Sequence, residues 1–248
     1  MASALTAEAQ RLALLRSAAG HFAVAATLVL ALTAGLAATF GMGTAFIVKA
    51  MGVLIAGSLL VVPALLRDHP FDRLGPANRI TLVRGVLTAT LAGFLGEQVS
   101  SSAALSIVAM GLSSLILDGI DGYFARRSNM ASPFGARFDM ETDALLILLF
   151  SVLAWQLNKA GPWVILSGSL RYLFLAAAWI LPWMKAPLPQ SLRRQTVCVI
   201  QIAALLAVLL PFVASPASDL LAAASLCLLC YSFAVDTIWL ARQRHASA

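Results

Sequence analysis

The sequence contains few charged residues. Of its 248 residues, 11% are Asp, Glu, Lys or Arg, 60% are hydrophobic, and the mean hydropathy is +0.89. A water-soluble protein of this length needs charges over most of its surface, so the composition excludes a soluble globular protein. It is typical of a membrane protein with several spanning helices. The formal net charge of +6 therefore relates to membrane topology and does not indicate a nucleic-acid partner.

Cysteine is also scarce. Cys198, Cys227 and Cys230 all lie in apolar runs. The last two form a CxxC pair, but no second pair of ligands lies near them in the sequence. We therefore expect small buried side chains at these positions instead of a metal or redox centre.

Long apolar runs fill most of the chain, and each has about the 20 residues that a helix needs to cross a membrane. They cover residues 21–40, 44–66, 81–97, 103–125, 139–158, 162–184, 195–213 and 219–241. The first run is long for a signal peptide and is followed by more spans, so we expect a retained helix. Residues 1–20 carry Glu8, Arg11 and Arg16, which favours a cytoplasmic amphipathic segment. The sequence thus predicts an all-α polytopic membrane helix bundle with about eight transmembrane helices.

Basic residues gather in alternate connections between these runs. These connections and the C-terminal end contain Arg67, Arg73, Arg79, Arg84, Arg126, Arg127, Arg137, Lys185, Arg193, Arg194, Arg242 and Arg244. The other connections carry almost nothing beyond Lys159, with Lys49 close to one of them. Cytoplasmic loops are rich in Lys and Arg, so an even number of spans places both termini in the cytoplasm. We expect a multi-pass protein of the cell (inner or cytoplasmic) membrane.

Four aspartates lie at the adjoining ends of two successive runs. Asp118 and Asp121 end one predicted helix and Asp139 and Asp143 begin the next, so each pair shares a helix face at the cytoplasmic membrane edge. At about 6 Å and an effective dielectric constant near 20, two carboxylates repel by roughly 3 kcal/mol, so cations or protons must accompany them. Carboxylate-only sites suit Mg²⁺, Mn²⁺ or Ca²⁺. A solvated acidic helix end is the alternative, although charged residues inside a membrane are usually functional.

These aspartates belong to a longer pattern, Asp118-x2-Asp121-Gly122-x2-Ala125-Arg126-x8-Gly135-x3-Asp139-x3-Asp143. The pattern resembles the signature of the CDP-alcohol phosphotransferase family, with every fixed position present. The resemblance implies a six-helix catalytic domain over residues 67–248, with two additional transmembrane helices over residues 21–66. It also implies a transferase of phospholipid biosynthesis that moves a phospho-substituent to an alcohol and releases CMP. We expect this substituent to be a phosphatidyl group from CDP-diacylglycerol.

The resemblance also assigns roles to the acids. Acids at the positions of Asp118, Asp121 and Asp139 act in the family chiefly as metal ligands. The acid at the position of Asp143 lies at the same metal site and acts as the general base. Mg²⁺ or Mn²⁺, with two ions, is therefore implied. The expected partners are a CDP-linked lipid donor, an alcohol acceptor, membrane lipids and a second copy of the chain in a homodimer.

Nucleotide and phosphate contacts are implied at Asn78, Thr81, Asp118, Gly122, Ala125, Arg126 and Gly135. Asn78 and Thr81 lie in a segment from Pro76 to Arg84 that is similar to the PNxxTxxR sequence often found before the signature. Three alternatives remain open: a helix start at the membrane interface for that segment, tight helix crossings for the glycines, and a membrane anchor for Arg126.

The acceptor alcohol stays open. After Gly135 the chain lacks both the DPxxDK-like ending of phosphatidylglycerophosphate synthases and the DSxxD ending of phosphatidylserine synthases. Arginines that would suit a phosphorylated acceptor are Arg137, Arg171, Arg193 and Arg194. Alternatively, Arg193 and Arg194 only satisfy the positive-inside preference, and Arg171 pairs with Asp236.

Two other functions fit part of the sequence. A cation-binding transporter or channel would explain acids in a membrane protein, but not the fixed spacing of Gly122, Ala125, Arg126 and Gly135 around them. A catalytically silent membrane scaffold would explain the apolar helices, but the complete signature argues against it.

Overall fold

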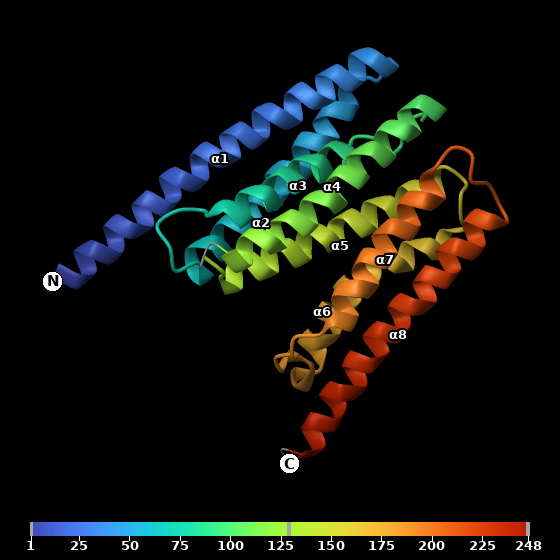
Figure 1. Ribbon diagram of the computed structural model, residues 1–248. Coiled ribbons are helices and arrows are strands. Elements are labelled where there is room, and N and C mark those ends of the chain that lie inside the picture. Colours follow the sequence, from blue (N-terminus) through green and yellow to red (C-terminus); the bar gives the residue numbers. More distant parts are fainter. Residues whose placement is uncertain (1, 128–129, 247–248) are drawn as a thin grey trace. The chain divides into compact units, whose positions relative to one another are not determined.

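The computed structural model describes residues 2–127 and 130–246, without the side chains of residues 2–8, 121, 123–126 and 245–246 (Figure 1). Its helices are α1 Ala2–Phe40, α2 Thr44–Asp68, α3 Pro76–Ala92, α4 Ser101–Arg127, α5 Pro133–Gln156, α6 Ile165–Ile180, α7 Leu192–Leu209 and α8 Ala217–Ala246. Short 3-10 turns, η1 Pro162–Val164 and η2 Pro182–Lys185, flank α6. The described residues contain no strand. The prediction of an all-α membrane helix bundle is confirmed.

The eight α-helices of the described residues differ in polarity. Among the described residues, six segments are long and apolar enough to cross a membrane, and they correspond to α1, α2, α4, η1 with α6, α7 and α8. The other two helices, α3 and α5, carry charged residues in their first halves, namely Arg79, Arg84, Arg137, Asp139, Glu141 and Asp143. Charged residues therefore interrupt the apolar sequence of α3 and α5, the helices that carry Arg84, Asp139 and Asp143.

The chain forms two compact units, residues 1–143 and residues 144–248. In the first unit, α1, α2 and α3 contact one another, and α3 also packs against α4. Helix α1 continues past residue 20 without a break, so the segment predicted as a separate amphipathic element is the first half of a longer helix. The division of the chain into residues 1–20, 21–66 and 67–248 stays a prediction.

Proline and glycine explain where α3 begins. Helix α2 ends at Asp68, just before Pro70, and α3 starts with Pro76 as its first residue. Proline suits that position because the N–H it lacks has no partner within the helix. The preceding residue, Gly75, has a φ of 77°, a conformation that other residues rarely adopt. The side chain of Met130 lies against Gly75, so this turn also contacts the segment before α5.

The second unit contains the rest of α5 together with α6, α7 and α8, and α7 packs along α8. At one end of α7, the Lys159 ammonium donates hydrogen bonds to the carbonyl oxygens of Leu210 at 2.9 Å and Pro211 at 3.2 Å. In the first unit, Lys49 binds Glu97 at 2.7 Å and also the Leu95 carbonyl. Lys159, in an arginine-poor connection, and Lys49, close to another, therefore both bind carbonyls beyond a helix end, where a cation is favourable.

The expectation of buried cysteines is wrong. Cys227 is exposed, Cys198 and Cys230 are half-buried, and all three are free thiols. The physical reason is that an apolar surface is favourable for a membrane helix, so a small apolar residue need not face the protein interior.

Candidate active site

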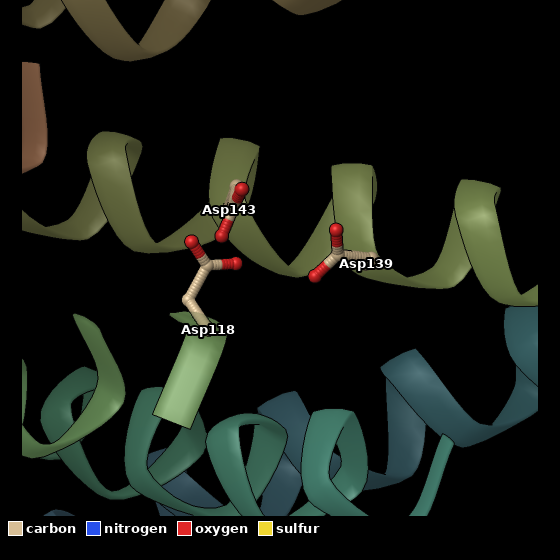
Figure 2. A group of neighbouring side chains, drawn as sticks. All are labelled: Asp118, Asp139 and Asp143. Carbon is tan, nitrogen blue, oxygen red and sulfur yellow. The ribbon is translucent and has the colours of Figure 1, made fainter. Parts of the chain in front are cut away.

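Three carboxylates meet in the first unit. Asp118 comes from the last part of α4, and Asp139 and Asp143 lie one turn apart near the start of α5. Figure 2 shows Asp118 pointing towards the helix that carries the other two. One carboxylate oxygen from each residue lies within 4.8 Å of the others, and all three residues are half-buried. This arrangement of oxygen atoms could hold a metal ion, and the donor type suits Mg²⁺ or Mn²⁺.

A buried arginine joins the three acids. Arg84 on α3 is 0% exposed. Its Nη1 lies 3.0 Å from Asp118 Oδ1 and also forms an ion pair with Asp139, while its Nη2 forms an ion pair with Asp143. One guanidinium thus links α4 to both acids of α5. It balances one of three negative charges, and the remaining charge of two favours a divalent cation beside it.

Sequence reasoning missed this role of Arg84. The residue was counted among the basic residues of a connection, where an arginine is usually an anchor at the membrane interface. One signal was available: Arg84 is the final residue of the PNxxTxxR-like segment. It also begins an apolar stretch in which a charge is costly unless it is paired.

Part of the predicted site lies outside the described residues. Asp121, Ala125 and Arg126 belong to α4, but their side chains are not described. Gly122 is half-buried on the same helix. The structure therefore brings together three of the four predicted carboxylates.

Asn78 and Thr81 are buried on α3 and bond within the first unit. Asn78 Nδ2 donates to the Leu74 carbonyl at 2.7 Å, and the Thr81 hydroxyl donates to the Ala77 carbonyl at 3.2 Å. A Cβ atom added at Gly135 would lie 2.7 Å from Asn78 Oδ1. Glycine is therefore needed at position 135 because α5 approaches α3 closely there, which is the helix-crossing alternative.

The four arginines considered for the acceptor fall into both units. In the first unit, Arg137 forms an ion pair with Asp68 at 2.7 Å. In the second, Arg171 is half-buried on α6, whereas Arg193 and Arg194 open α7.

The two arginines of α7 bind an acid of α8. Arg193 forms an ion pair with Asp236 and lies 2.5 Å from the Ser232 hydroxyl oxygen. Arg194 lies 3.5 Å from the same carboxylate and also donates to the Pro189 carbonyl. Sequence analysis offered Arg171 as the partner of Asp236, and the structure pairs this acid with Arg193 and Arg194. Two guanidinium groups share one carboxylate, so the cluster keeps a net positive charge.

A comparison with known families decides the class of the protein. Residues 74–235 match the family described as CDP-alcohol phosphatidyltransferase. The chain belongs to this family. The matched region contains Arg84, the three clustered aspartates and the paired arginines of α7. No curated protein and no solved structure matches the chain.

Membership in the CDP-alcohol phosphatidyltransferase family, together with the helical membrane fold, makes the chain a membrane transferase. The family acts on a CDP-linked donor and an alcohol acceptor and generally depends on a divalent metal. The match starts at residue 74, so α1, α2 and the residues up to Arg73 lie before it.

Proposed function

We propose that the chain transfers a phosphatidyl group from CDP-diacylglycerol to an alcohol and releases CMP, with Mg²⁺ or Mn²⁺ held by the aspartates. The observation that carries the proposal is the cluster of Asp118, Asp139 and Asp143 around the Arg84 guanidinium, within the region that matches the family. We place this cluster and both termini in the cytoplasm, because basic residues are concentrated in the connections on that side.

Asp118, Asp139 and Asp143, together with Asp121, would hold two divalent ions. When bound, such ions neutralise the pyrophosphate of the donor and the charge that develops on the departing CMP. Arg84 forms ion pairs with all three described acids, and these contacts fix the carboxylate groups before substrate binds. Fixed charges of this kind need little rearrangement during the reaction.

Asp143 is the proposed general base. It takes the proton from the hydroxyl of the acceptor as the alcohol oxygen forms its bond to the donor phosphorus. The bond between that phosphorus and the phosphate oxygen of CMP breaks, and CMP leaves with the bonding electron pair. Because Arg84 binds one oxygen of Asp143, the carboxylate is held in one orientation, and it acts mainly through its position.

The arginines at the start of α7 are proposed to bind a phosphate group of the acceptor, with Arg137 and Arg171 as further candidates. Two observations support this: the net positive charge of Arg193, Arg194 and Asp236, and their place at a helix N-terminus, which favours anions. Arg193 also joins α7 to α8, so replacing it would disturb packing. Arg194 is the better residue to test, because it is bound to Asp236 at the longer distance of 3.5 Å.

The transfer reaction can be tested with purified protein in lipid nanodiscs. Radiolabelled CDP-diacylglycerol, Mg²⁺ or Mn²⁺ and a panel of phosphorylated and uncharged alcohols are supplied, and CMP release is measured. We expect release that requires both an acceptor and a divalent ion, with Asp139→Asn as the inactive control. Release that continues in excess EDTA, or no release with any acceptor, would contradict the proposal.

The acceptor class has its own test in the same assay. Arg194→Gln should raise the KM for a phosphorylated acceptor several-fold and leave the KM for CDP-diacylglycerol nearly unchanged. A wild-type enzyme that uses uncharged alcohols equally well would exclude the phosphate pocket.

The homodimer stays a proposal, and cross-linking in nanodiscs of defined stoichiometry would test it.

A further inference from the structure

A buried histidine lies just outside the region that matches the family. His69 follows α2 and is 8% exposed. Its Nε2 lies 2.9 Å from the Arg73 carbonyl oxygen, and its Nδ1 lies 3.0 Å from the hydroxyl oxygen of Ser132. A carbonyl oxygen only accepts hydrogen bonds, so Nε2 carries a proton. In the neutral ring, Nδ1 then accepts the proton of the Ser132 hydroxyl.

Ser132 caps helix α5. Its hydroxyl oxygen accepts a hydrogen bond from the Gly135 N–H at 3.1 Å, and its carbonyl oxygen accepts one from the Ala136 N–H at 3.2 Å. This is the geometry of an N-cap, which fixes where a helix begins. The hydrogen bonds therefore continue from α5 through the Ser132 hydroxyl and the imidazole to Arg73, three residues before α3.

Aromatic contacts hold the imidazole in place. The ring packs edge-on against Phe71 and Phe134, with centroid distances of 5.3 and 5.5 Å. Phe134 in turn stacks on Phe138 at 5.6 Å, and both belong to the buried core of the first unit. The histidine thus contacts the first turn of α5 through an apolar surface as well as through Ser132.

The starts of α3 and α5 determine which residues meet further along. Asn78 lies against Gly135 near the two starts, and Arg84 meets Asp139 and Asp143 about one to two turns beyond. The two helices therefore run in the same direction with matched ends. A slip of one residue along the axis would move a carboxylate by about 1.5 Å and turn it by about 100°. Such a slip would break the ion pairs of Arg84.

We propose that His69 is a positioning residue for the aspartate cluster. Its imidazole ties the start of α3 to the start of α5 and sets the register at which Arg84 meets Asp139 and Asp143. Its importance for catalysis rests on the proposed metal-dependent transfer. The contribution comes from outside the region that matches the family, so the N-terminal part of this chain takes part in building the site.

Three further contacts secure the same connection. The side-chain amide of Gln10 on α1 donates to the Pro70 carbonyl at 2.8 Å, and Asp68 pairs with Arg137 of α5 at 2.7 Å. The Leu74 N–H also lies 3.5 Å from the Ser17 hydroxyl oxygen of α1. Helix α1 thus supports the segment that contains His69.

The variant His69→Phe keeps an aromatic ring between Phe71 and Phe134 but cannot form the hydrogen bonds. Binding of Mn²⁺ to the protein in nanodiscs is measured by EPR, in the absence of substrate. We expect His69→Phe to weaken Mn²⁺ binding about tenfold, the lower end of the effect of residues that orient metal ligands. His21→Phe is the matched control, because the His21 ring forms a hydrogen bond with the Ser17 carbonyl of its own helix. We expect the Mn²⁺ affinity of this variant to stay within twofold of wild type.

A double-variant cycle tests whether His69 acts through Ser132. In a Ser132→Ala background, His69→Phe should weaken Mn²⁺ binding by less than twofold, since the link is already broken. Ser132→Thr keeps the hydroxyl and should bind Mn²⁺ like wild type. Equal effects of His69→Phe in both backgrounds, or a wild-type affinity in His69→Phe, would overturn the proposal. If His69→Phe does not fold, a wild-type affinity in Ser132→Ala overturns it.

The register can be measured without metal or activity. Spin labels are placed at Arg79 on α3 and Met140 on α5, both exposed, in a background without the three native cysteines. Dipolar EPR should show that His69→Phe shifts or broadens the distance distribution by at least about 1.5 Å, the rise of one residue. An unchanged distribution would reject the positioning role. A protein that releases no CMP but shows this shift would refute the transfer reaction and leave the role of His69 intact.

Discussion

Replacing Arg84 with glutamine would leave three acids without their shared guanidinium. Arg84 is fully buried and lies 3.0 Å from Asp118, a distance at which opposite charges attract by about 5–6 kcal/mol at an effective dielectric constant of 20. One oxygen from each carboxylate lies within 4.8 Å of the others, and two charges at that distance repel by about 3.5 kcal/mol on the same scale. The acids of Arg84→Gln must therefore take up protons, move apart or bind a cation.

The expected loss of stability follows from the buried ion pairs. Removing one partner of a buried ion pair costs about 3–5 kcal/mol, because the other charge stays buried without compensation. For a chain of this size, each kcal/mol lowers the melting temperature by about 2–4 °C. We expect the apparent melting temperature of Arg84→Gln in EDTA to lie about 6–20 °C below that of wild type.

A divalent cation should restore most of this loss. A ligand that binds only the folded protein, at a concentration 1,000 times its Kd, stabilises by about 4 kcal/mol. This is close to the expected loss. The missing positive charge should also make the site more attractive to cations, so Mn²⁺ should raise the melting temperature of Arg84→Gln more than that of wild type.

The assay is thermal unfolding in detergent micelles, followed by intrinsic fluorescence with EDTA or with saturating Mn²⁺. Arg79→Gln is the matched control, since Arg79 is an exposed arginine on the same helix. Arg84→Lys keeps the charge but not the planar guanidinium, so its stability should lie between those of Arg84→Gln and wild type. An Arg84→Gln protein that melts like wild type in EDTA, or that Mn²⁺ stabilises no more than wild type, would refute this role of Arg84.

Further changes separate the roles of other residues. Asp143→Asn should lower the transfer rate by about 10²–10⁴ with a smaller effect on Mn²⁺ affinity. Asp118→Asn should lower the transfer rate and also weaken Mn²⁺ binding. If Asp143→Asn weakened Mn²⁺ binding as much as it lowered the transfer rate, the assignment of the base would be contradicted. Gly168→Ala should destabilise the second unit by about 1–3 kcal/mol, because the added Cβ would lie 2.2 Å from the backbone of α5. Gly57→Ala is the control and should not destabilise, because no atom lies within 4 Å of its added Cβ. Equal melting temperatures of the two variants would refute this prediction. Reporter fusions at the C-terminus and in the 97–102 connection should lie on opposite sides of the membrane, and a shared side would disprove the topology.

The fold class was available from the sequence alone. Apolar runs near the length of a membrane span define helices without knowledge of their partners, because a helix satisfies its own backbone hydrogen bonds in lipid. Most run boundaries lie within a few residues of the observed helix ends, for example 44–66 against Thr44–Asp68. The run at 81–97 differs more, since α3 already begins at Pro76 and ends at Ala92. The first turns of α3 are polar, so a search for apolar runs does not include them.

The meeting of Asp118, Asp139 and Asp143 was also predictable, because they lie at the adjoining ends of two successive helices. Spacing along one helix and a short connection are local features that a sequence contains directly. For Asp121 the meeting with the other acids stays a prediction, because its side chain lies outside the described residues.

Only the tertiary structure decided which residues hold the acids in place. Arg84 and Asp139 are 55 residues apart, and His69 and Ser132 are 63 apart, so no periodicity connects them. The pairing of Arg193 with Asp236, 43 residues away, was likewise not proposed from the sequence. An arginine near a membrane helix end can be an interfacial anchor or a buried ion-pair partner, and the residue type alone does not distinguish the two. What separates the two is the packing of one helix against another, which places a charge beside its partners and away from water.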